Sequence, residues 1–149
     1  MNDELEKTVY EAHRSNGTIV MDQGIQSIKD RVSAIRQILK KHPIQKDSDH
    51  LFICQDDDGG YWFPLADDTT IGYSKKNDLT IDSEYVSGQH CRIKKTETGW
   101  VLEDLDSANG VQVNKEKISE CYLNYGDIIQ IADNCLIFFP KPLTNKEIT

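Results

Sequence analysis

A series of short apolar runs separated by turn residues constrains the fold of this 149-residue chain more than any other feature. The runs recur about every 8 to 12 residues and are rich in β-branched and aromatic residues, a spacing typical of a β-sandwich. Gly, Asn and Asp dominate the segments between them, as tight turns require. The expected strands are Leu51–Cys54, Tyr61–Phe63, Leu79–Ile81, Cys91–Ile93, Val101–Leu105, Val111–Val113, Ile128–Ile131 and Cys135–Phe139.

A different periodicity occupies the N-terminal third of the chain. Between Asp22 and Lys41 the apolar residues follow the alternating 3-4 spacing of one helical face, and this stripe comprises Ile25, Ile28, Val32, Ile35 and Leu39. Asp22 is expected to cap this helix, and His42-Pro43 to end it. A shorter helix is predicted over about Asp3–Arg14. The domain prediction is therefore a helical extension over 1–48, a β domain over 49–142 and a tail over 143–149.

The helical stripe has two interpretations. It covers only about two heptads, fewer than a safe coiled-coil assignment requires. Packing on the β domain or on the first helix is one interpretation, and pairing with a second copy of the chain to form a homodimer is the other.

Charge and composition narrow the classes of partner. Residues 1–48 carry 8 basic and 7 acidic residues, whereas residues 49–149 carry 9 and 18, so the net charge of −8 lies in the β domain. An acidic domain repels nucleic acid and anionic membranes. No apolar run reaches the length of a membrane span, and the N-terminus is too acidic for a secretory signal. A cytoplasmic protein that neither binds nucleic acid nor inserts into membranes is expected.

The four cysteines lie far apart and form no zinc-binding motif. Cys54, Cys91 and Cys135 have apolar neighbours and are expected to be buried, reduced thiols. The Asp56–Gly60 segment lacks the glutamate of an EF-hand and is ordinary turn chemistry. We expect no metal and no cofactor.

Four short motifs stand in fixed order among the expected strands: Gly72-Tyr73, Ser87-Gly88-Gln89-His90, Ser107-Ala108-Asn109-Gly110 and Gly126-Asp127. Their order and spacing over about residues 50–140 resemble the forkhead-associated (FHA) family, small modules that bind phosphothreonine peptides. The resemblance implies a mainly β, FHA-like sandwich of about 11 strands, a number within the range of such architectures.

The resemblance assigns roles position by position. The phosphate-gripping arginine of the family falls on Tyr73, and a second phosphate-facing position falls on Gly88. The phosphate-binding serine is kept as Ser87, and the asparagine that holds the peptide backbone is kept as Asn109. The loop-bracing histidine is kept as His90. Ala108 replaces a Ser or Thr.

The other motif residues have structural explanations. Gly72, Gly110, Gly126 and Asp127 suit tight turns and strand starts. Lys75 and Lys76 lie close enough in sequence to Tyr73 to substitute for the missing cation, although lysine lacks the bidentate grip of arginine.

The sequence therefore favours a phosphate-independent interaction module, a scaffold or assembly part with a degenerate phosphothreonine pocket. The predicted partner is a protein or peptide, unphosphorylated, bound at Tyr73, Ser87, Gly88, Asn109, Lys75 and Lys76. One alternative is a phosphothreonine reader with a rearranged pocket in a kinase signalling pathway. Another is a homo-oligomeric structural part that assembles through the helical stripe. Degenerate relatives also occur in secretion machinery. Because Ser87 and His90 alone do not make a catalytic site, no enzyme is expected.

Overall fold

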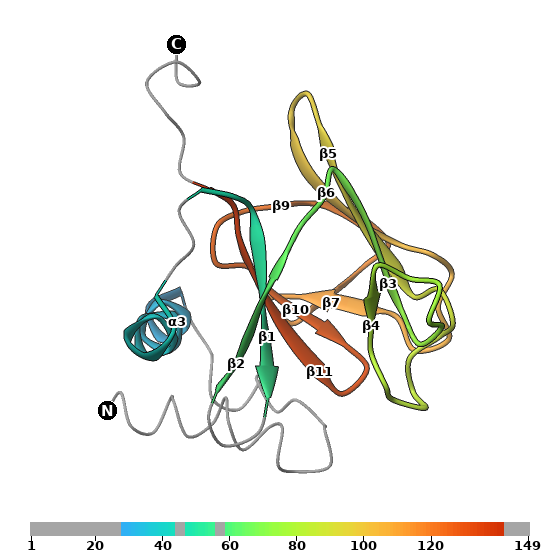
Figure 1. Cartoon of the computed structure of the whole chain (residues 1–149), viewed down its shortest axis with the longest axis horizontal. Coiled ribbons are helices and arrows are strands. Elements are labelled where there is room, and N and C mark those ends of the chain that lie inside the picture. Colours follow the sequence, from blue (N-terminus) through green and yellow to red (C-terminus); the bar gives the residue numbers. More distant parts are fainter. Residues whose placement is uncertain (1–27, 44–46, 56–58, 142–149) are drawn as a thin grey trace.

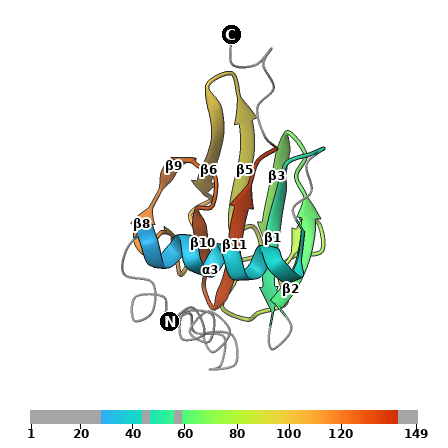
Figure 2. The same ribbon diagram turned by 90° about the vertical axis from the view of Figure 1, so that its left-hand side faces the viewer.

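The computed structural model describes residues 28–43, 47–55 and 59–141, which form eleven strands and one helix. The strands build two sheets that pack face to face, and helix α3 (Ile28–Lys41) crosses the outer face of one of them (Figure 1, Figure 2). The mainly β, FHA-like sandwich of eleven strands is confirmed. The expected helix over about Asp3–Arg14 and the cap at Asp22 lie outside the described residues.

The six-stranded sheet has the order β2-β1-β11-β10-β7-β8. Strand β1 (His50–Gln55) pairs antiparallel with both β2 and β11, so the first and last strands of the sandwich are neighbours. The remaining strands are β2 (Gly59–Pro64), β11 (Asn134–Phe139), β10 (Ile128–Ile131), β7 (Val111–Val113) and β8 (Glu116–Ile118).

The five-stranded sheet has the order β4-β3-β5-β6-β9. Its strands are β4 (Leu79–Thr80), β3 (Asp68–Gly72), β5 (Cys91–Thr96), β6 (Gly99–Asp104) and β9 (Glu120–Leu123). The β3–β4 pair is parallel, with Ile71 opposite Leu79, and the other pairs are antiparallel. The short β4 therefore lies on one side of β3, and β5 lies on the other side.

The inner core fills the space between the two sheets. Successive side chains of a strand point to opposite faces, so Leu51 and Ile53 of β1 point inward, whereas Phe52 and Cys54 point outward. The most deeply buried inner residues include Leu51, Ile71, Ile93, Leu102, Ile129, Leu136 and Phe138. Cys54, Cys91 and Cys135 are buried, as predicted, Cys121 is half-buried, and none of the four forms a disulfide in the structure.

A second apolar cluster lies on the outer face of the six-stranded sheet, beneath α3. Ile35 and Ile38 of the helix pack there with residues of β1, β10 and β11, namely Phe52, Cys54, Ile128, Cys135, Ile137 and Phe139. Leu39 and Trp62 join this cluster at its margin. The helix therefore packs against the sandwich of its own chain, the first of the two interpretations of its apolar stripe.

The buried face of α3 differs from the predicted stripe. Ile38, which the stripe omits, is the most buried of the helix side chains that the structure describes, with 2% exposure, whereas Val32 is 42% exposed. The buried positions 35, 38 and 39 have the i, i+3, i+4 spacing of a straight helix on a sheet, whereas the predicted stripe follows a heptad. Ile25 and the side chain of Ile28 lie outside the described part. The helix ends at Lys41, as predicted, and the amide of His42 still donates to the carbonyl of Ile38 at 2.9 Å.

The strand registers define two opposite poles of the sandwich. His50 pairs with Pro64 and Phe139 at one pole, where β3 also begins at Asp68. At this pole the Asp49 carboxylate accepts a hydrogen bond from the Lys141 amide at 2.9 Å. The other pole carries Gly72, which ends β3, and Cys91, which begins β5. No helix among the described residues combines the length and apolar character that crossing a membrane requires.

Candidate functional site

The candidate site is the loop end, defined here as residues 72–78, 84–90 and 105–110 at the pole where β3 ends. Backbone hydrogen bonds tie its first two segments together: the Tyr73 amide donates to the Ser87 carbonyl at 2.9 Å, and the Ser74 amide to the Gly88 carbonyl at 3.1 Å. The side-chain amide of Asn77 donates to the carbonyls of Ser74 and Gly88 at 2.8 and 2.6 Å. These bonds fix the backbone on which Tyr73 and Ser87 stand.

Two glycines set the spacing of these segments. A Cβ added to Gly72 would lie 2.2 Å from the Gly88 carbonyl oxygen, so the close approach of the two loops requires glycine at 72. A Cβ added to Gly88 would meet nothing within 4 Å. Gly88 therefore presents bare backbone to open space at the position where the family carries a phosphate-facing side chain.

His90 braces the loop end from inside. Its side chain is fully buried, and Nδ1 accepts a hydrogen bond from the Ser87 amide at 3.0 Å. Nε2 therefore carries the proton and donates to the Gly110 carbonyl at 2.8 Å. Since both ring nitrogens bind backbone groups, neither is directed at the Ser87 hydroxyl. The predicted bracing role of His90 agrees with these contacts.

The third segment is held against the second through side chains. Ser87 Oγ accepts a hydrogen bond from the Ala108 amide at 2.9 Å, which leaves the hydroxyl proton of Ser87 available to a ligand. Asn109 Nδ2 donates to the Tyr85 carbonyl at 2.7 Å. Ser107 Oγ accepts from the Gly110 amide at 2.9 Å and donates to Asp104 at 2.5 Å, so this turn is closed by its own serine.

Two tyrosines and two lysines are among the exposed side chains of the loop end, together with Asp78, Glu84, Gln89, Asp106 and Asn109. Tyr73 is 50% exposed and Tyr85 is 55% exposed. Lys75 and Lys76 are exposed in the segment that follows Tyr73. Tyr85 was not among the predicted site residues. Its position two residues before Ser87, inside the motif region, is the signal by which it could have been found.

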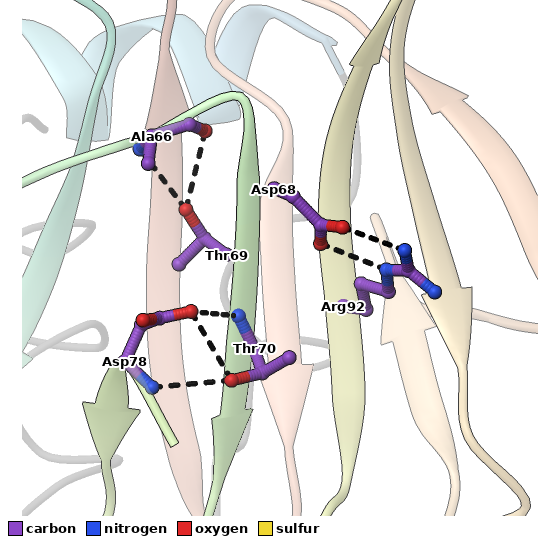
Figure 3. Close-up of polar contacts among 6 residues, drawn as sticks. All are labelled: Ala66, Asp68, Thr69, Thr70, Asp78 and Arg92. Atoms are coloured by element: carbon purple, nitrogen blue, oxygen red, sulfur yellow. Dashed lines mark hydrogen bonds and ion pairs between the residues drawn. The ribbon is translucent and has the colours of Figure 1, made fainter. Parts of the chain in front are cut away.

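The one arginine of residues 49–149 lies outside the loop end. Arg92 of β5 forms a bidentate ion pair with Asp68 of β3: Nε donates to Oδ1 at 2.8 Å and Nη2 to Oδ2 at 2.6 Å (Figure 3). The hydrogen bonds from Arg92 lower the pKa of Asp68, and Asp68 in turn raises the pKa of Arg92. Because Arg92 stands opposite Thr70 but binds Asp68, two residues further from Gly72, its guanidinium reaches away from the loop end.

A shallow hollow of about 460 Å³ lies between this ion pair and the loop end and is lined by residues of both, and sequence reasoning did not predict it. Asp78 closes one side, where its carboxylate accepts hydrogen bonds from the amide and hydroxyl of Thr70 at 2.9 and 3.2 Å (Figure 3). Gln89 and Leu105 also line it. The Asp68 and Asp78 carboxylates of this hollow already accept hydrogen bonds from Arg92 and Thr70.

The structure brings part of the predicted set together. Tyr73, Ser87, Gly88 and Asn109 share the loop end, with Gly72, His90 and Gly110 beneath them. Gly126 and Asp127 lie elsewhere: Asp127 is buried, and its carboxylate accepts hydrogen bonds from the Asn114 side chain at 2.9 Å and the Asn124 amide at 2.7 Å. The described residues contain no cluster of His, Cys, Asp and Glu that could hold a metal ion.

Comparison with known proteins identifies the kind of domain. Residues 69–132 match the family model described as "FHA domain". The transcriptional regulatory protein EmbR of Mycobacterium tuberculosis is 44% identical over 81 residues, which are 53% of this chain and 21% of EmbR. The oxoglutarate dehydrogenase inhibitor of Corynebacterium diphtheriae is 31% identical over 74 residues, 50% of this chain and 52% of that protein. This chain thus spans about a fifth of the first of these relatives and about half of the second.

The solved structures agree with the family model. An FHA domain from a structural and functional analysis of phosphothreonine-dependent FHA domain interactions superimposes with a TM-score of 0.59 at 29% identity, over 64% of this chain and 99% of that one. Mycobacterium tuberculosis EmbR in complex with a low-affinity phosphopeptide gives a TM-score of 0.59 at 29% identity, over 94% of this chain and 44% of EmbR. The described β domain therefore has an FHA-like fold.

Proposed function

We propose that this chain, an FHA-domain protein by its fold and by the match at residues 69–132, binds an unphosphorylated peptide or protein partner at its loop end. The observation that carries the proposal is the half-exposed Tyr73, which stands where the FHA resemblance implies a phosphate-gripping arginine. A phosphate dianion is held by charge-assisted hydrogen bonds, and a phenol supplies no charge.

The energetic argument favours a neutral ligand. A hydrogen bond to a charged group contributes about 1.5–3 kcal/mol, so losing the arginine alone costs roughly ten- to a hundredfold in affinity. Gly88 removes a second phosphate-facing side chain. Residues 49–149 carry a net charge of −9, 9 basic against 18 acidic residues, which opposes an anionic ligand at long range.

The exposed side chains of the loop end suit a peptide. Tyr73 and Tyr85 offer flat apolar rings with a polar edge, the residue type enriched at protein interfaces. Ser87 keeps a hydroxyl proton to donate, and Asn109 is positioned by Tyr85 at the same surface. Such a surface can hold a peptide backbone without a phosphate.

One observation favours the alternative of a phosphothreonine reader. Ser87 Oγ accepts a hydrogen bond from the Ala108 amide and so keeps its own hydroxyl proton to donate, which a phosphate oxygen could accept. The EmbR domain, solved with a low-affinity phosphopeptide, supports this alternative. Lys75 and Lys76 would then supply the positive charge.

An NMR titration of the labelled chain separates the two functions. Two matched degenerate peptide pools are used, one with phosphothreonine and one with threonine. We expect the two pools to produce equal chemical-shift changes at Tyr73, Ser87 and Asn109, or no change with either pool. Shifts that only the phosphorylated pool produces, and that Lys75→Ala or Lys76→Ala weakens, would overturn the proposal in favour of the reader.

A gain-of-function variant tests whether the side chains at positions 73 and 88 are the reason that phosphate adds nothing to binding. Tyr73 is half-exposed and Gly88 has open space above it, so Tyr73→Arg with Gly88→Lys fits the backbone. We expect this double variant to acquire binding to the phosphorylated pool, by about tenfold or more. Tyr73→Phe is the matched control, which should acquire none.

A further inference from the structure

Two buried cysteines lie side by side beneath helix α3, away from the loop end. Cys54 of β1 and Cys135 of β11 occupy the next position in the register that pairs Ile53 with Leu136. Their sulfur atoms are 3.5 Å apart, and both belong to the outer cluster on the six-stranded sheet. They are 5% and 0% exposed.

The backbone at this position is compatible with a covalent bond. Directly opposed residues on antiparallel strands have Cα atoms about 4.5–5.5 Å apart, and disulfides span Cα distances of about 4.4–6.8 Å. A bond of about 2.05 Å between the sulfurs therefore needs them to approach by roughly 1.5 Å, a movement of side chains within one pair of strands.

Helix α3 packs on the apolar cluster that holds the two thiols. Ile35 and Ile38 lie in the same apolar cluster as both cysteines. The hydrogen bond with Cys54 and burial raise the pKa of the Cys135 thiol, so it stays protonated while the helix is docked. Since the thiolate is the nucleophile in disulfide exchange, the docked helix keeps the pair inert.

We propose that Cys54 and Cys135 form a reversible disulfide by exchange with a small-molecule disulfide of the glutathione type, and that undocking of helix α3 permits the reaction. One cysteine thiolate attacks the small disulfide and releases one thiolate. The other cysteine attacks the mixed disulfide and releases the second. The pair loses two electrons and two protons, and the small disulfide is reduced to two thiols.

The other two cysteines provide internal controls. Cys91 lies in the inner core between the sheets, where burial raises its pKa. Cys121 is half-buried on β9. Neither belongs to the cluster beneath α3, so uncovering that cluster leaves their surroundings unchanged.

The experiment is incubation of the full chain with oxidised glutathione, then alkylation of free thiols and a non-reducing peptide map. We expect a peptide pair joined through Cys54 and Cys135, with Cys91 alkylated, and full reversal by reduced glutathione. In the Cys135→Ala variant the reaction should stop at a mixed disulfide between Cys54 and glutathione. Absence of the Cys54–Cys135 link, or scrambling of all four cysteines in similar yield, would overturn the proposal.

A second measurement tests the role of the helix. Ile38→Ala should speed formation of the link by about tenfold or more, because truncating a buried isoleucine weakens the packing that holds α3 down. The matched control is Val113→Ala, which loosens the inner core but touches no part of the outer cluster. Equal acceleration by the two variants would mean that the link forms only on global unfolding, and the proposed control by α3 would be wrong. If Ile38→Ala fails to fold, Ile35→Val takes its place.

Discussion

At the scale of single residues, Gly72 and Gly88 lie against each other, but only Gly72 has no room for a side chain. The Cβ that Gly72→Ala adds would lie 2.2 Å from the Gly88 carbonyl oxygen, a backbone atom that cannot move without opening the two loops. We expect Gly72→Ala to lower the free energy of unfolding by about 2 kcal/mol or more. Gly88→Ala should change it by less than about 0.5 kcal/mol. Urea unfolding of the two variants measures both, and similar losses would contradict the account of the loop contact.

The Asp68–Arg92 ion pair predicts a pH dependence. The pKa of Asp68 is lowered in the folded chain, so its contribution to stability is present above the pKa of the unfolded carboxyl and is lost as pH falls through the folded value. Asp68→Asn should therefore lower the thermal midpoint slightly at pH 7. At acid pH, well below the ordinary carboxyl pKa of about 4, the variant should match the parent.

Two controls belong to that measurement. The pair is exposed, so added salt should reduce the difference at pH 7. Glu84→Gln, at an exposed carboxyl outside the pair, should show no such difference. A difference that persisted in acid would show that Asp68 acts through packing rather than charge.

At the scale of elements, the β7–β8 hairpin carries strain at one residue. Its two-residue turn, Asn114-Lys115, has φ angles of 50° and 77°, and lysine at the second position is unfavourable there. Lys115→Gly should raise the free energy of unfolding by about 0.5–1 kcal/mol.

Asn114→Gly is the matched variant at the other turn position. Asn114 Oδ1 accepts a hydrogen bond from the Ile128 amide at 3.0 Å, and its Nδ2 donates to Asp127 at 2.9 Å. We expect this variant to lose stability in the same thermal or urea assay. A gain from both substitutions would mean that the side-chain contacts of Asn114 contribute little.

Elements with strong apolar periodicity could be predicted from the sequence. The bounds predicted for β7 and β10 match the structure. Strands β3, β8 and β9 had no predicted run of their own, because β3 and β8 each have one large apolar side chain and β8 and β9 lie at sheet edges. Ile38 was missed for a related reason: the heptad that fitted the stripe does not describe a straight helix lying on a sheet.

The candidate site was predictable only as a set of positions. The motif spacing indicated that Tyr73, Ser87 and Asn109 belong together, and the loop hydrogen bonds place them at one pole. The hollow lined by Asp68, Asp78 and Arg92 had no such signal, because it depends on strand register and on which way one arginine extends.

At the scale of the whole molecule, α3 and the sandwich share a core outside the sandwich interior. Ile38 is almost fully buried there, whereas Val32, nearly two turns earlier, is exposed. We expect Ile38→Ala to cost about 2–4 kcal/mol and Val32→Ala less than about 0.5 kcal/mol.

The two tryptophans report on the two clusters separately. Trp62 packs at the margin of the outer cluster and Trp100 in the inner core. Trp100→Phe leaves Trp62 as the reporter, and Trp62→Phe leaves Trp100. When Ile38→Ala is added to each, the fluorescence midpoint in urea should shift more where Trp62 is the reporter. Equal shifts would mean that the helix and the sandwich unfold as one unit.

The pairing of β1 with β11 brings the entrance and exit of the β domain together: His50 stands opposite Phe139, and Asp49 binds the amide of Lys141. The loop end lies at the opposite pole. Whatever the β domain is joined to on either side therefore leaves it at one pole, and Tyr73, Ser87 and Asn109 stand at the pole that points away from both junctions.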